Sequence, residues 1–330
     1  MKISYSEYEL KPLSLLNNQS ENLQPRKGVL LKMLWPDGKV GYADLHPWPE
    51  LGDQPLETQI QNMKKGKMSS QLEQSIWLAR RDAVARSQNV SLLKHVDDIR
   101  NNYLVTDVLL IDEAKLKEIS RTGYKSLKIK VGRDQKAEAD LINRAAPYFL
   151  LRLDFNSVGN LTSFQKFLQL LKPETIKKIE YVEDPFPYDQ AKWAEAQKLV
   201  PLAADRELSK IDFKKTIHPA FQVMVIKPAV IDVEKAIRFA KQENLKCVIT
   251  SQMDHAIGQM HALAVASEVK REHEGMILDS GCATHQLFEK DEYFKEIHQQ
   301  GAYIQAVRGA GVGFTDLLEN RQWQHAFPPL

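Results

Sequence analysis

From about Val105 onward, short apolar segments alternate with segments in which apolar residues recur at helical spacing. The apolar segments are nearly continuous, which is typical of parallel strands buried on both faces. The predicted strands are 108–111, 125–131, 149–154, 178–183, 201–204, 222–227, 246–251 and 276–279. The predicted helices that follow them are 112–120, 134–146, 161–171, 188–199, 212–217, 232–244, 255–269 and 286–299. This alternation predicts an α/β fold of the (β/α) barrel type, although an open doubly wound sheet has the same periodicity.

The first hundred residues have a different pattern. Two strand-like segments, 28–35 and 39–45, are separated by a Pro-Asp-Gly sequence at 36–38. Such a sequence favours a hairpin turn, because proline presets φ and glycine adopts positive φ. Helical spacing follows over 56–63 and 72–86. Strands followed by helices predict a small α+β unit ahead of the barrel.

The glycine-rich segment 309–313 near the C-terminus has the spacing of a dinucleotide-binding motif. It lacks the preceding strand and the downstream acidic residue that such a motif needs. We therefore expect a turn that leads the chain back over the surface.

Composition narrows the classes of protein. The chain has 45 lysines and arginines against 43 aspartates and glutamates, a net charge of +2, with 43% hydrophobic and 27% charged residues. This balance is typical of a soluble globular protein and argues against a nucleic-acid binder or a disordered chain. The two cysteines, Cys247 and Cys282, cannot form a disulfide framework, which favours a reducing compartment. With no apolar N-terminal run or membrane-length segment, we expect a cytoplasmic protein without a membrane partner.

Charged residues stand at the ends of four consecutive predicted strands: Asp154, Glu183, Asp205 and Lys227. Their separations each correspond to about one strand–helix unit. In a parallel barrel the C-terminal ends of the strands meet at one mouth, where active sites lie. Three carboxylates there would repel one another without a counter-charge, and Mg²⁺ prefers such oxygen ligands. The pattern therefore predicts a site for a hard divalent cation.

Two lysines, Lys128 and Lys130, lie two positions apart on one predicted strand and so point to the same face. Held close together near a metal, the two ammonium groups would disfavour each other's charge and make a neutral, basic amine accessible. Lys227 would approach from across the barrel. These residues predict abstraction of a proton next to a carboxylate, with the metal stabilising an enediolate.

Several motifs together resemble the enolase superfamily, and within it the o-succinylbenzoate synthase branch of menaquinone biosynthesis. They are Lys-Ile-Lys at 128–130, Leu-Arg-Leu-Asp-Phe-Asn at 151–156, Val-Glu-Asp-Pro at 182–185, Ala-Ala-Asp-Arg-Glu-Leu at 203–208 and Val-Ile-Lys-Pro at 225–228. Segments 41–58, 249–258 and 281–291 are similar to the capping loop and the seventh and eighth strand regions of this family. The resemblance implies a modified (β/α)₇β barrel over 101–300, with an α+β capping domain formed by 1–100 and 301–330.

The resemblance also implies roles for the strand-end residues. Asp154, Glu183 and Asp205 would bind Mg²⁺, with Mn²⁺ as a substitute. Lys130 would remove the α-proton of 2-succinyl-6-hydroxy-2,4-cyclohexadiene-1-carboxylate and then help hydroxide to leave as water, which makes the protein a lyase. Lys227 would stabilise the enediolate, and Lys128 would assist Lys130.

Other residues near these motifs are candidates for supporting roles. Asn156 would be a polar group beside the metal ligands, and Ser251 a substrate contact in a segment that holds the succinyl carboxylate through backbone N–H groups in the family. Arg152 could point inward to meet a carboxylate or form a buried structural ion pair. The chain departs from the family's frequent Asp-Glu-Ser at the third ligand, so that Glu207 could compete with Asp205. The loop at Trp48 and Pro49 could close over a substrate.

The same lysines and metal serve N-acylamino acid racemases and dipeptide epimerases, which are the alternative function. Dipeptide epimerases typically have Asp-x-Asp at the eighth strand, whereas this chain has Asp279-Ser280-Gly281. A barrel retained only for binding would have lost a ligand or a lysine, and all are present. We expect a small-molecule carboxylate substrate and no nucleic-acid partner, while the sequence leaves the oligomeric state open.

Overall fold

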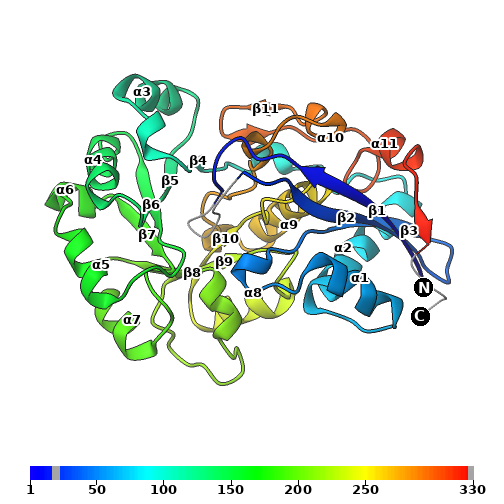
Figure 1. Ribbon diagram of the computed structural model, residues 1–330, viewed down its shortest axis with the longest axis horizontal. Coiled ribbons are helices and arrows are strands. Elements are labelled where there is room, and N and C mark those ends of the chain that lie inside the picture. The colour runs from blue at the N-terminus through cyan, green and yellow to red at the C-terminus, as the bar shows by residue number, and fades with distance from the viewer. Residues whose placement is uncertain (17–22, 326–330) are drawn as a thin grey trace.

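The computed structural model describes residues 1–16 and 23–325 (Figure 1). Residues 17–22 and 326–330, which belong to the predicted capping domain, lie outside the described residues. An antiparallel sheet of four strands has the order β13-β1-β2-β3. Its strands are β1 (Lys2–Leu10), β2 (Arg26–Leu34), β3 (Val40–Leu45) and β13 (Gln324–His325). The chain's last described strand thus pairs with its first, so both ends of the chain build one sheet.

The predicted turn between β2 and β3 is present. Gly38 has φ of 78°, and the Trp35 amide donates to the Lys39 carbonyl across the hairpin at 3.0 Å. Two helices follow, α1 (Leu56–Lys64) and α2 (Ser70–Ser87), and the hydroxyl of Ser69 caps the start of α2. α2 packs so closely on β3 that a Cβ on Gly41 would lie 2.0 Å from the Ala79 carbonyl oxygen. The α+β unit predicted from the first hundred residues is therefore confirmed.

The second sheet consists of seven parallel strands in the order β10-β9-β8-β7-β6-β5-β4, which follows the sequence from one edge to the other. The strands are β4 (Tyr103–Val105), β5 (Ser126–Lys130), β6 (Leu150–Asp154), β7 (Ile179–Glu183), β8 (Leu202–Ala204), β9 (Val223–Ile226) and β10 (Lys246–Ile249). The helices between and after them are α3 (Glu113–Arg121), α4 (Gln135–Ala145), α5 (Leu161–Leu168), α6 (Pro173–Ile176), α7 (Gln190–Ala196), α8 (Val233–Gln242) and α9 (Ala256–Glu272). The predicted fold, a modified barrel with an α+β cap, is confirmed.

The eighth position of the barrel is filled by an irregular segment. Ile277 forms a single parallel bridge to Cys247 of β10, Gly281 bridges Thr250 just after β10, and Ser280 bridges Asn101 just before β4. This segment closes the ring of strands without forming the regular strand predicted at 276–279. The prediction was wrong in detail because each edge of the segment makes only isolated bridges.

Three other predicted elements differ from the structure. Segment 108–111 is a 3₁₀ turn, η3 (Val108–Leu110), whose Leu109 and Leu110 side chains are exposed, so its apolar run does not mark a buried strand. Segment 212–217 forms turns rather than a helix, and the 3₁₀ helix η4 (Arg206–Lys210) precedes it. The predicted helix 286–299 is reduced to η6 (His285–Leu287) and α10 (Glu292–Lys295). Asp291 caps α10 and thereby starts a new, short helix.

The remaining described elements are short. They are η1 (Pro49–Leu51), η2 (Val96–Asp98), η5 (Glu274–Met276), β11 (Gln299–Gln300), β12 (Tyr303–Ile304) and α11 (Thr315–Glu319). The glycine-rich segment 309–313 does not run over the surface as expected. Gly311 bridges Ser91, and Val312 is buried with its amide donating to Asp82 at 2.8 Å. The segment thus packs against α2.

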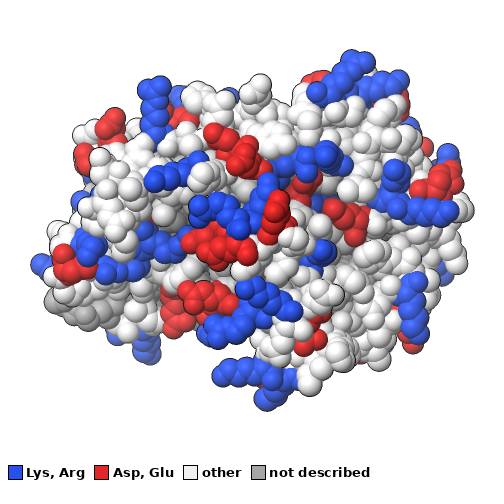
Figure 2. All heavy atoms as spheres, turned by 180° about the vertical axis from the view of Figure 1, so that it is seen from behind, with Lys and Arg blue, Asp and Glu red and all other residues white. Residues whose placement is uncertain are grey.

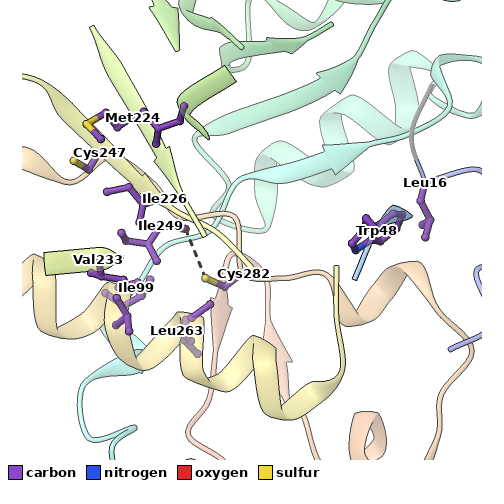
Figure 3. Close-up of a cluster of buried hydrophobic side chains, with 14 of the residues drawn as sticks. Leu16, Trp48, Ile99, Met224, Ile226, Val233, Cys247, Ile249, Leu263 and Cys282 are labelled. Carbon is purple, nitrogen blue, oxygen red and sulfur yellow. Dashed lines mark hydrogen bonds between the residues drawn. The ribbon is translucent and has the colours of Figure 1, made fainter. Parts of the chain in front are cut away.

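Apolar side chains from β9, β10, α8 and α9 form part of the core (Figure 3). Both cysteines are buried free thiols, and the Cys282 thiol lies 3.7 Å from the Ile249 carbonyl. No helix in the described part of the chain is long and apolar enough to cross a membrane. Over the face in Figure 2, acidic and basic side chains are interspersed, in keeping with the nearly balanced composition.

Candidate active site

The strand-end charges predicted from the sequence meet at one mouth of the barrel. In the register of the sheet, Lys130 on β5 lies beside Asp154 on β6, which lies beside Glu183 on β7. Asp205 and Lys227 come directly after β8 and β9. Because neighbouring parallel strands end at the same level, one residue per strand brings each charge to this mouth.

These charges form a buried network of ion pairs. The Lys128 ammonium lies 2.7 Å from both Glu183 carboxylate oxygens and 3.0 Å from Asp154 Oδ2. Lys130 Nζ lies 2.6 Å from the same Asp154 oxygen, and Lys227 pairs with Asp205. The carboxylates of Asp154, Glu183 and Asp205 are buried, so each depends on these lysines for counter-charge.

Burial and charge shift the pKa values of this network in opposite directions. Burial raises the pKa of Glu183 well above its ordinary value, and the nearby Asp154 charge adds to the shift. Burial also disfavours the ionised forms of Asp154 and Asp205, but their lysine partners outweigh it and lower the pKa of both carboxyls. For Lys128, burial lowers the pKa, yet the Asp154 and Glu183 carboxylates raise it well above its usual range. The expected weakening of the Lys128 charge by a neighbouring lysine is therefore outweighed by these carboxylates.

The donor set fits a hard divalent cation. Its three carboxylates are buried and supply only oxygen, and burial together with the nearby Asp154 charge raises the pKa of Glu183, which shows how costly the ionised carboxylates are at this site without a cation. Within residues 1–16 and 23–325, no three His, Cys, Asp or Glu side chains already converge as a ligand set. The Lys128 ammonium bridges Asp154 and Glu183, while Lys130 and Lys227 each contact one carboxylate, so a cation would have to displace these ammoniums.

A cavity opens between this network and the capping region. Its lining residues are Trp48, Leu51, Asn102, Leu104, Lys128, Lys130, Asn156, Tyr181, Asp205, Arg206, Val225, Lys227, Val248, Thr250, Ser251, Gln252, Met253, Gly281, Ala283 and Thr284. The lining thus combines lysine, arginine and aspartate side chains with those of leucine, valine and tyrosine. A larger open cleft of about 1440 Å³, bordered by His95 and Tyr303, contains none of the strand-end charges. Of the strand-end charges, Asp205 and Lys227 line the smaller cavity, together with Lys128 and Lys130.

The supporting residues predicted from the sequence take different places. Asn156 has φ of 50° and accepts from Lys130 Nζ at 3.2 Å, which helps to orient this amine. Ser251 lies in the cavity wall and shares a hydrogen bond of 2.7 Å with Thr284. Arg152 is fully buried and pairs with Glu180 at 2.6 Å, so the structural ion pair is the alternative observed.

Glu207, the alternative third ligand, is engaged by donors from the loops beside the site. Its carboxylate accepts from the Ser157 hydroxyl at 2.9 Å and from the Tyr188 amide at 2.6 Å, and it pairs with Lys210. These bonds hold Glu207 in the loop structure beside the site. Because Glu207 is absent from the cavity lining and Asp205 is part of it, the structure favours Asp205, while the choice between the two as metal ligand stays a prediction.

Sequence reasoning did not identify Asp184 as part of the site. Its carboxylate accepts from the Asp205 and Arg206 amides at 3.0 and 2.8 Å, and burial followed by the Asp205 charge raises its pKa to about 7. It therefore fixes the backbone that carries Asp205. The Glu-Asp-Pro triplet at 183–185 is the sequence feature that could have suggested a second acidic group here.

The capping loop 48–53 covers the cavity. Trp48 and Leu51 line it, and Arg206 Nη1 donates to the Leu51 carbonyl at 2.6 Å. On the other side, Gln252 donates to Asp53 at 3.3 Å. Contacts from two barrel loops thus hold this loop, and Figure 3 shows Trp48 near Leu16, away from the other labelled side chains of the same hydrophobic cluster.

Comparisons with known proteins agree with this architecture. Residues 3–85 match the family model for the N-terminal domain of O-succinylbenzoate synthase, and residues 111–316 match the enolase C-terminal domain-like family. The o-succinylbenzoate synthase of Bdellovibrio bacteriovorus is 46% identical over 98% of both chains. That of Pasteurella multocida is 24% identical over 81% of this chain and 86% of its own.

Solved structures share the fold. A mandelate racemase/muconate lactonizing protein from Herpetosiphon aurantiacus superposes with a TM-score of 0.74 at 20% identity, covering 95% of this chain and 97% of its own. A dipeptide epimerase from Enterococcus faecalis, complexed with Mg and the dipeptide L-Leu-L-Tyr, has a TM-score of 0.72 at 16% identity, covering 94% and 98%. From the matched domains and the nearly full-length similarity, the chain belongs to the o-succinylbenzoate synthase family of the enolase superfamily.

Proposed function

We propose that this chain catalyses the Mg²⁺-dependent syn-dehydration of 2-succinyl-6-hydroxy-2,4-cyclohexadiene-1-carboxylate to 2-succinylbenzoate, a step of menaquinone biosynthesis. The observation that supports it is the network of three buried carboxylates and three lysines at the barrel mouth, whose lysines and Asp205 line a covered cavity. The family membership supplies the substrate class. We place the reaction in the cytoplasm, in keeping with two buried free thiols. The division into a cap of 1–100 with 301–330 and a barrel of 101–300 stays a prediction.

In this proposal Asp154, Glu183 and Asp205 hold Mg²⁺, or Mn²⁺ in its place. When bound, the cation supplies positive charge that stabilises the negative oxygens of the enediolate. With these carboxylates holding the cation, Lys128 and Lys227 would lose their present partners and become available to the substrate. Lys227, on the side of β9, then faces the substrate carboxylate as a fixed ammonium and stabilises charge that grows on it.

Lys130 is the proposed base and acid. As a neutral amine it takes the proton from the ring carbon that bears the carboxylate, and the electron pair passes into the enediolate. When this pair returns to form the aromatic ring, the neighbouring C–O bond breaks, and Lys130 gives its proton to the departing hydroxide so that water leaves. One residue can do both because both transfers occur on the same face of the ring. Asn156, which accepts from Lys130 Nζ, holds the amine toward the cavity.

Racemisation of N-acylamino acids is the second candidate, because Lys130 and Lys227 both line the cavity and could act as opposed bases. Dipeptide epimerisation is less well supported. Asp279 is engaged by Arg100 at 2.8 Å and by the Ser126 hydroxyl at 3.0 Å, which leaves it poorly placed to hold a substrate amino group.

The test is an assay of the purified protein with the cyclohexadiene substrate and with N-acylamino acids, each with Mg²⁺ and after chelation. We expect Mg²⁺-dependent formation of the aromatic product, followed by ultraviolet absorbance. Racemisation without dehydration would overturn the proposal in favour of the second candidate.

A further inference from the structure

Two buried carboxyl groups meet at the boundary between the cap and the barrel, apart from the proposed metal ligands. Asp44 lies on β3 of the cap, and Asp254 lies just before α9 of the barrel. Both residues are buried, with 4% and 1% of their surface exposed. A Cβ on Gly258 would lie 2.4 Å from Asp254 Oδ2 and 3.0 Å from Asp44 Oδ2. The two oxygens are therefore close neighbours, and the glycine at 258 leaves room for both.

The two carboxyl groups differ in their hydrogen bonds. The Tyr8 hydroxyl on β1 donates to Asp44 Oδ1 at 2.5 Å, and the His255 backbone amide donates to Asp44 Oδ2 at 2.9 Å. Such bonds favour the charged form of a carboxyl group. By contrast, Asp254 Oδ1 is buried without a hydrogen-bond partner among the described residues. Burial raises the pKa of Asp254 well above its ordinary value, and the Asp44 charge raises it further.

The surroundings of the pair do not favour two ionised carboxylates. The titratable and charged side chains around it, among the described residues, are Tyr8, His46, His255, Asp291 and Arg321. Burial lowers the pKa of His46 to about 3 and that of His255 well below its ordinary value, so both imidazoles are neutral. The Arg321 charge acts on Asp44, but burial outweighs it and raises the pKa of Asp44 to about 7. One proton on Asp254 would remove the repulsion within the pair and make its unpartnered oxygen less costly to bury.

We propose that Asp254 is a neutral carboxylic acid that donates a hydrogen bond to Asp44 Oδ2. This bond joins β3 of the cap to the start of α9 in the barrel. Asp254 directly follows the segment 250–253, and all four residues of that segment line the cavity of the candidate active site. The carboxyl pair therefore positions this part of the cavity wall against the cap. The hydrogen bond itself stands on the contacts at the boundary, whereas its effect on the substrate rests on the proposed function.

Infrared difference spectroscopy tests the protonation state of Asp254. Spectra of the wild type and of Asp254→Asn are recorded with saturating Mg²⁺ at about pH 8, above the pKa of Asp44, so that Asp44 is mostly ionised. We expect the wild type to show the C=O band of a neutral carboxylic acid and Asp254→Asn to lack it. Asp212→Asn is the matched control, because it makes the same change at an exposed carboxyl in a turn and should keep the band. A wild type without an Asp254-dependent acid band would overturn the proposal.

Steady-state kinetics with the cyclohexadiene substrate test the positioning role. Asp254→Asn keeps a neutral donor to Asp44, so we expect its KM to stay within about twofold of the wild type. Asp254→Ala removes the donor and should raise KM about 2- to 30-fold, the range for coupling through a packed network, with a smaller change in kcat. A merely structural role predicts less folded protein with an unchanged KM, and that result would refute positioning. Asp254→Asn keeps the size of the side chain, so the infrared comparison decides the protonation state even if Asp254→Ala does not fold.

The two measurements separate this inference from the proposed function. A protein that shows the Asp254 acid band but performs no dehydration keeps the carboxyl pair and refutes the proposed function together with the positioning role. A protein that dehydrates the substrate without an Asp254-dependent band keeps the proposed function and refutes the pair.

Discussion

Replacing Lys130 by alanine removes the amine that we propose as both base and acid. A positioned general base typically contributes 10²- to 10⁴-fold in rate. Because Lys130 acts in both proton transfers, we expect the loss in kcat to reach at least the upper end, about 10⁴-fold. A loss of this size corresponds to ~5.5 kcal/mol of transition-state stabilisation.

The effect of Lys130→Ala on stability should be much smaller. Removing one partner of a buried ion pair typically costs ~3–5 kcal/mol, since the other charge is left unpaired. Here Asp154 keeps Lys128 at 3.0 Å, so we expect the free energy of unfolding to fall by only ~1–3 kcal/mol, the worth of a hydrogen bond to a charged group. Mg²⁺ should bind as tightly as in the wild type or more tightly, since one competitor for Asp154 is gone.

The assay follows formation of the aromatic product by absorbance, with urea unfolding and Mg²⁺ titration of the same sample. Lys125→Ala is a matched control, because Lys125 is an exposed lysine just before β5. Turnover by Lys130→Ala within tenfold of the wild type would refute its role as the base. A lost Mg²⁺ affinity would instead show that Lys130 is needed to build the metal site.

Three further predictions concern the metal, the pH dependence and the cap. Chelation of Mg²⁺ should abolish dehydration. Mg²⁺ at 100 times its dissociation constant should raise the free energy of unfolding, measured in urea, by ~2.7 kcal/mol. Equal stability with and without Mg²⁺ would contradict a metal site in the folded protein. Burial raises the pKa of Asp44 to about 7, above its value in the unfolded chain. The folded protein therefore binds the Asp44 proton more tightly than the unfolded chain, and the stability that this proton contributes is lost as the pH rises from about 4 to 7. Asp44→Asn should flatten this fall in thermal melting temperature, and an unchanged pH profile would contradict the assignment. Gly41→Ala should lower the free energy of unfolding by ~1–3 kcal/mol, because the new Cβ would clash with the α2 backbone. Gly275→Ala, which has open space at its Cβ, should have little effect. Equal urea midpoints for the two variants would refute the close packing of α2 on β3.

The sequence alone predicted much of the fold, for a physical reason. Strands buried on both faces are mostly apolar, so β8 and β9 appear as apolar runs followed directly by a charged residue, Asp205 and Lys227. Where a segment is only partly buried, its apolar pattern predicted the wrong element. Leu109 and Leu110 are apolar but exposed in a turn, and the eighth barrel position is held by isolated bridges that leave no periodic pattern.

The amino-acid sequence by itself determined which charges stand at the strand ends, and in a parallel barrel one position per strand is enough to bring them to a common mouth. Only the tertiary structure decided how those charges pair. It placed Lys128 between Asp154 and Glu183, turned Glu207 into the loop and joined Arg206 to the Leu51 carbonyl of the cap. These contacts join residues far apart in the chain, and side-chain direction across such distances depends on packing rather than on local periodicity.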